Sequence, residues 1–84
     1  MRTAYLILSI EEYGKLISFC IDNDISVFRT YWDEREKGNR CFEINREDKR
    51  CYYASKQYWM ESGYAIKTPK FELNEYGKWK LIKE

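Results

Sequence analysis

Residues 46–62, REDKRCYYASKQYWMES, decide which fold the sequence can form. The stretch suits a helix because Asn45 precedes Asp48 by three positions, a capping spacing, and because Gly63 follows it as a helix-ending residue. We therefore predict a helix over residues 46–62. The alternative is a hairpin in which residues 50–55, rich in tyrosine, form a strand.

The chain before this stretch predicts a strand, a helix and two further strands. Residues 3–8 are a short apolar run of strand length. Ser9 stands three positions before Glu12, which is a capping box, and apolar residues then recur at helical spacing as far as Ile21. The short polar run at residues 22–24 is expected to end that helix. Strands are expected at residues 25–32 and 40–44, antiparallel to each other across a loop at 34–39.

The chain after residue 62 predicts three short extended segments, at residues 64–67, 70–73 and 78–82, with a turn at 74–77. The resulting order is β-α-β-β-α-β with an extra C-terminal strand, which matches the ferredoxin-like split pattern. We predict an α+β fold in a single domain of residues 1–84, a ferredoxin-like βαββαβ sandwich. Its two helices would lie on one face of an antiparallel sheet.

Composition argues against an enzyme. The 84 residues include no histidine, so the commonest general base and metal ligand are missing. The cysteines Cys20, Cys41 and Cys51 form no CxxC pair and are expected to be reduced and structural. No nucleotide-binding glycine motif occurs, so we expect no cofactor and no metal. The apolar run at residues 3–10 is too short for a signal peptide or a membrane span, which favours a cytoplasmic protein without membrane contact.

The stretch Lys49–Trp59, KRCYYASKQYW, carries three basic and four aromatic residues and no acidic one. Single-stranded nucleic acid is bound by this mixture, because cations follow the phosphates and rings stack on unpaired bases. In a helix over 46–62, Lys49, Tyr53 and Lys56 would share the exposed face, whereas Tyr58 and Trp59 would face the core. Two smaller basic and aromatic patches lie at residues 29–32 and 78–80. The predicted contacts to nucleic acid are Arg29, Tyr31, Lys49, Arg50, Tyr53, Lys56, Lys78 and Lys80.

The stretch at residues 37–44, KGNRCFEI, resembles the third strand of an RNA-recognition motif in its basic-glycine pair, Lys37-Gly38. It departs from that family at Asn39, Cys41 and Ile44, where aromatic residues are expected. The resemblance therefore extends to the architecture and to one dipeptide.

In composition, the chain resembles small accessory proteins of tailed phages, being short, rich in Tyr, Lys and Glu, and ending in FELNEYGKWKLIKE. That resemblance implies an anti-defence function, in which the protein would inhibit a host factor. Two functions stay open. The first is a non-enzymatic protein that binds RNA or single strands and acts on a host ribonucleoprotein or nuclease. The second is an inhibitor or adaptor that binds a host protein without contacting nucleic acid, because Tyr, Trp and Arg favour binding hot spots. The oligomeric state is open too, a homodimer included.

Overall fold

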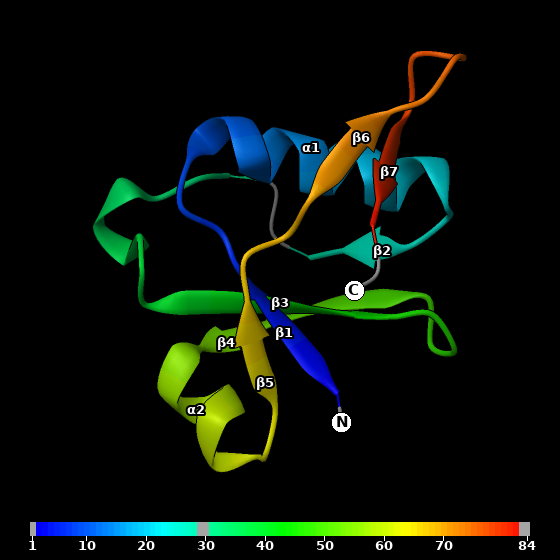
Figure 1. Ribbon diagram of the computed structural model, residues 1–84. Helices are drawn as coiled ribbons and strands as arrows, with labels where there is room; N and C mark the ends of the chain where they lie inside the picture. Colours follow the sequence, from blue (N-terminus) through cyan, green and yellow to red (C-terminus); the bar gives the residue numbers. More distant parts are fainter. Residues whose placement is uncertain (1, 29–30, 83–84) are drawn as a thin grey trace.

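The centre of the molecule is a mixed five-stranded sheet (Figure 1). The computed structural model describes residues 2–28 and 31–82. The strand order is β2 (Ser26–Val27), β4 (Arg50–Ser55), β3 (Arg40–Asn45), β1 (Thr3–Leu6) and β5 (Ala65–Lys67). The α+β class is confirmed. The antiparallel sheet was wrong, because β1 pairs with β5 and β2 pairs with β4 in parallel, and the ferredoxin-like topology is not confirmed.

The two helices cover opposite faces of this sheet (Figure 1). Helix α1 (Ile10–Asp22) packs with Phe42 and Cys51, which point to one face. Helix α2 (Lys56–Glu61) places Trp59 against Cys41 and Ala4 on the other face. Because neighbouring residues of a strand point to opposite faces, Cys41 and Phe42 lie in different cores. The prediction of two helices on one face is therefore wrong.

The stretch at residues 46–62 forms a strand followed by a short helix, so the predicted long helix was wrong. Strand β4 pairs with β3 over its whole length, from Arg40 opposite Ser55 to Asn45 opposite Arg50. The side chain of Asn45 accepts a hydrogen bond from the backbone of Asp48 at 3.0 Å, as a helix cap would, but here it closes the hairpin turn. The same bond could cap a helix or close a hairpin turn, so the pairing of β4 with β3 decided which of the two forms.

The strand predicted at residues 25–32 is reduced to β2. Of its described residues, 25–28 and 31–32, Ser26 and Val27 alone form a ladder, and they pair in parallel with β4 rather than antiparallel with β3. The later apolar residues pack elsewhere: the ring of Trp32 lies 5.5 Å from that of Tyr13 on α1. A short 3-10 helix, η1 (Glu34–Glu36), then leads into β3.

Helix α1 begins and ends where the sequence predicts. The Ser9 hydroxyl accepts the Glu12 backbone N–H at 3.1 Å, and the Asn23 side chain donates to the carbonyl of Phe19 at 2.8 Å. These bonds satisfy backbone groups that a helix end leaves without partners.

The C-terminal segment forms a small two-stranded sheet of β6 (Phe71–Leu73) and β7 (Trp79–Leu81) that lies beside α1 (Figure 1). The side chain of Asn74 accepts the backbone N–H groups of Tyr76 and Lys78, and Gly77 has a φ of 76°, so the predicted turn is confirmed. Leu81 of β7 is buried in the α1-side core. The hairpin is thereby held against the end of α1.

Candidate functional site

A cleft lies where the C-terminal end of α1, the β3–β4 turn and the β6–β7 hairpin meet. Its volume is about 640 Å³. We call it the basic cleft. Its lining residues are Phe19, Asp22, Asn23, Arg46, Asn74, Lys78, Trp79, Lys80, Leu81 and Ile82.

The basic cleft is positively charged. Arg46, Lys78 and Lys80 line it, and Asp22 is the one carboxylate among its described lining residues. Lys80 stands opposite Glu72 in the β6–β7 ladder, but Glu72 does not line the cleft. The predicted residues Lys78 and Lys80 are thus brought together with Arg46, which was not among the predicted contacts. The cleft has room and charge for an anion.

Aromatic rings hold cations around the basic cleft. The Arg46 guanidinium carbon lies 5.4 Å from the ring centre of Phe19, and Lys15 Nζ lies 4.6 Å from that of Trp79. Cation–π contacts of this kind attract the charge to the ring face. Arg46 is therefore directed toward the cleft by a ring that is itself buried in the core.

A second cavity, of about 500 Å³, adjoins the basic cleft and shares Arg46 and Leu81 with it. Here the charges are balanced, because Arg2 forms an ion pair with the buried carboxylate of Glu43 at 3.1 Å. A hydrogen bond to the same carboxylate raises the pKa of Tyr64. The excess of positive charge therefore lies on the hairpin side, in the basic cleft.

The predicted stripe of Lys49, Tyr53 and Lys56 is not formed, because the three residues do not share one helix. Lys49 is exposed in the β3–β4 turn, and Lys56 is exposed at the start of α2, at the opposite end of the ladder. Arg50 begins β4, and its guanidinium carbon lies 5.7 Å from the ring centre of Phe28.

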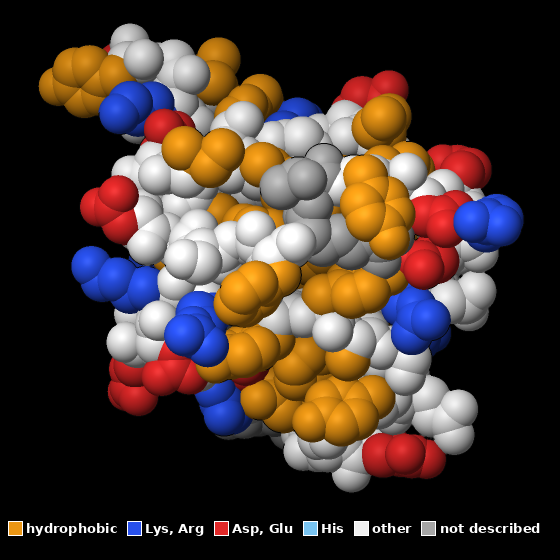
Figure 2. Space-filling model, turned by 180° about the vertical axis from the view of Figure 1, so that it is seen from behind, with side chains coloured by type: hydrophobic (Ala, Val, Ile, Leu, Met, Phe, Trp, Pro, Cys, Tyr) orange, Lys and Arg blue, Asp and Glu red, His pale blue; other side chains and the backbone are white. Residues whose placement is uncertain are grey.

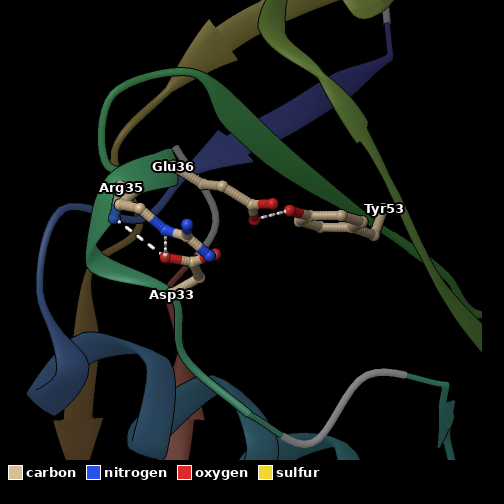
Figure 3. A network of polar contacts seen from close by, with 4 residues as sticks. All are labelled: Asp33, Arg35, Glu36 and Tyr53. Atoms are coloured by element: carbon tan, nitrogen blue, oxygen red, sulfur yellow. Dashed lines mark hydrogen bonds and ion pairs between the residues drawn. The ribbon is translucent and has the colours of Figure 1, made fainter.

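Tyr53 points inward instead of outward (Figure 3). Its hydroxyl donates a hydrogen bond to Glu36, and its ring centre lies 4.9 Å from that of the buried Phe42. In the same network, Asp33 accepts bonds from the backbone and guanidinium of Arg35 (Figure 3). Tyr53 is half-buried rather than on an exposed helix face, because in β4 its position faces the α1-side core.

The remaining predicted contacts lie at the β2–β3 connection and in α2. Tyr31 is exposed and lines a small cavity with Tyr53 and Arg40. Arg29 lies outside the described residues. In α2, Trp59 is buried as expected, but Tyr58 is 55% exposed, so its predicted place in the core was wrong. A six-residue helix has room for only one residue at the centre of its buried face.

Another cavity, which we call the aromatic pocket, opens beside β4. Its volume is about 250 Å³. Its lining residues are Val27, Phe28, Phe42, Cys51, Tyr52 and Tyr53. Phe28 was missed as a site residue because it was assigned to a longer strand. Of the pocket's two tyrosines, Tyr53 was among the predicted contacts and Tyr52 was not.

The three cysteines are free and buried. The hydrogen bond between the Cys20 and Cys51 thiols, together with burial, raises the pKa of Cys51, and the same bond lowers that of Cys20. Within the part of the chain that the structure describes, no cluster of three or more acidic or sulfur ligands could hold a metal ion. Likewise, no helix in residues 2–28 and 31–82 is long and apolar enough to cross a membrane.

No protein family model, curated protein or solved structure matches the chain. The basic cleft and the aromatic pocket are therefore the features of the molecule that bear on its function.

Proposed function

We propose that this protein binds single-stranded nucleic acid, with RNA favoured, and that it does so without catalysing a reaction. The observation that carries the proposal is the convergence of Arg46, Lys78 and Lys80 on one cleft that has a single described carboxylate in its lining. Phosphate groups are the natural ligands of such a set of cations.

The chain's overall charge favours single strands over duplex DNA. The net charge is only +1, whereas duplex-binding domains usually carry a strongly basic face. A local cleft with cations and flanking rings is sufficient for a flexible strand, which can bend into a concave site. Asn23 and Asn74 also line this cleft, where their side chains fix the end of α1 and the β6–β7 turn.

The test is fluorescence anisotropy of a labelled oligouridine RNA, titrated with the protein at several salt concentrations. Charge reversal at both Lys78 and Lys80 should weaken binding. It should also flatten the log-log dependence of affinity on salt by roughly 0.7 for each lost phosphate contact. The melting temperature should change little, because both side chains are exposed.

The matched control reverses the charge of Lys37 and Lys67, two exposed lysines that do not line the basic cleft and were not predicted contacts. This pair changes the net charge equally, so it separates a local contact from a general electrostatic effect. Equal losses in the two double variants would contradict a site at the basic cleft. Absence of RNA binding by the parent protein at low salt would overturn the function itself.

A second candidate function is favoured by a different observation. Apolar side chains gather across the middle of the rear face and toward α2, with charged side chains around them (Figure 2). Large exposed apolar residues include Phe28, Tyr31 and Tyr58. Such a surface suits a protein partner, and the compositional resemblance to phage accessory proteins would make that partner a host factor. A tagged pull-down read by mass spectrometry and RNA sequencing distinguishes the two, since only the first candidate recovers RNA directly.

A further inference from the structure

The aromatic pocket exists because the β2–β4 ladder stops early. Among the described residues, Val27 and Cys51 form the last pair of this ladder, and Phe28 lies beyond the end of β2. The gap that opens between Phe28 and the next residues of β4, Tyr52 and Tyr53, is the pocket of about 250 Å³. The ring of Phe28 stands at its outer side, where it is 75% exposed.

The inner walls of the pocket are held in place before any ligand arrives. Phe42 is 2% exposed and packs against the ring of Tyr53. The hydroxyl of Tyr53 is bonded to Glu36, which fixes the ring that faces Phe42. Preorganised rings lose little conformational entropy on binding, so the pocket suits a flat, rigid ligand.

The charges around the pocket select an anionic ligand. None of the described residues that line it carries a formal charge. The guanidinium of Arg50 lies 5.7 Å from the ring centre of Phe28, at the exposed side. A suitable ligand therefore has an uncharged aromatic ring, which would fit the pocket, and an adjoining negative group, which would contact Arg50.

We propose that the aromatic pocket holds one unpaired nucleobase of a bound strand, stacked on Phe28, with the adjoining phosphate at Arg50. This inference rests on the proposed function and names a base-binding position for it. The β3–β4 turn, residues 46–49, connects the two places. Its first residue, Arg46, lines the basic cleft, and Arg50 comes directly after its last residue. A strand with phosphates in the basic cleft crosses this turn to reach Phe28.

The first experiment measures oligouridine affinity for Phe28→Leu and Phe28→Tyr. Loss of one stacked base should weaken binding by roughly 5- to 150-fold in the leucine variant, while the tyrosine variant keeps the ring and the affinity. The salt dependence should stay at the parent value in Phe28→Leu. It should become flatter by roughly 0.7 in Arg50→Gln, which loses a phosphate contact.

Tyr58→Ala is the control, because it removes another exposed ring, at α2. Parent-like affinity of Phe28→Leu, with the Lys78/Lys80 charge reversal still weakening binding, overturns the pocket and leaves the proposed function standing. If the parent binds no RNA, both proposals fall together.

A second measurement tests whether the pocket binds a nucleotide or an aromatic amino-acid side chain. Uridine monophosphate and N-acetyltyrosinamide are titrated separately while the amide NMR signals of Cys51 and Tyr52 are followed. Shifts with the nucleotide that disappear in Phe28→Leu support the proposal. Shifts with the tyrosine derivative alone overturn it and indicate a pocket for an aromatic side chain of a protein partner.

Discussion

The hydroxyl of Tyr53, in the middle of β4, donates a hydrogen bond to the carboxylate of Glu36, seventeen positions earlier in the chain. The bond joins η1 to the central sheet. The guanidinium carbon of Arg40 also lies 5.8 Å from the centre of the Tyr53 ring. The Glu36 bond therefore anchors η1, which lies between β2 and β3, to the central sheet.

Tyr53→Phe should therefore destabilise the protein. A hydrogen bond to a charged group contributes about 1.5–3 kcal/mol, and a comparable fall in the free energy of unfolding is expected in urea denaturation. Tyr76→Phe is the control, because Tyr76 is 78% exposed in the β6–β7 turn. Equal stability of the two variants would show that the Glu36 bond does not support the fold.

Adjacent residues of α2 should respond very differently to truncation. Trp59 is 5% exposed, and its indole Nε1 donates to the carbonyl of Cys41 at 3.1 Å. Trp59→Ala should lower the free energy of unfolding by about 3–5 kcal/mol, as for other buried aromatic residues. Tyr58→Ala loses an edge contact with the Trp59 ring, worth about 0.5–1.5 kcal/mol. Similar losses in the two variants would contradict the assignment of Trp59 alone to the core.

A charge on the core side of α1 should unfold the protein. Leu16 is fully buried, so Leu16→Asp places an unpaired carboxylate in the apolar core. Ile10→Asp introduces the same charge at the exposed start of the same helix, where a negative charge is favourable. Circular dichroism should show lost structure for Leu16→Asp and a parent-like spectrum for Ile10→Asp.

Two glycines should respond to alanine with opposite signs. Gly63 follows α2 with a φ of 83°, so Gly63→Ala should lower stability by about 1–2 kcal/mol through backbone strain. Gly14 lies inside α1 with open space around it, so Gly14→Ala should raise stability by about 1 kcal/mol through helix propensity. Melting curves of the two variants should move in opposite directions, and a stabilised Gly63→Ala would refute the strain argument.

Neither chelator nor reductant should change the melting temperature. The three thiols are free, and the described side chains form no metal-binding cluster, so neither reagent has a structural bond to remove. Thermal scans with and without each reagent test this directly. A fall of many degrees with either one would reveal a stabilising metal or disulfide.

The part of the candidate site that residues close together in sequence provide was predictable. Lys78 and Lys80 flank Trp79 in sequence, and they meet in one cleft. Arg46 could not be assigned with them, because it joins the cleft only when the β3–β4 turn and the β6–β7 hairpin dock on the end of α1. Phe28 became a candidate only once the ladder was known to stop at Val27.

The sequence by itself determined the features that depend on neighbours a few residues apart. They are the Ser9 cap, the Asn23 end of α1, the glycine after α2 and the Asn74 turn. These interactions form whatever the rest of the molecule does, so their residue types are informative.

Only the tertiary structure decided the state of residues 46–62. The bond from Asp48 to Asn45 fits a helix start and a hairpin turn equally, so it carries no preference. Once β3 lies between two cores, its residues need a paired strand at each edge. Strand β4 provides that pairing on one edge. Its own side chains alternate between the two cores, so that Tyr53 faces α1 and Tyr52 faces α2. Backbone pairing and burial on both faces of the sheet therefore outweighed the local helical pattern.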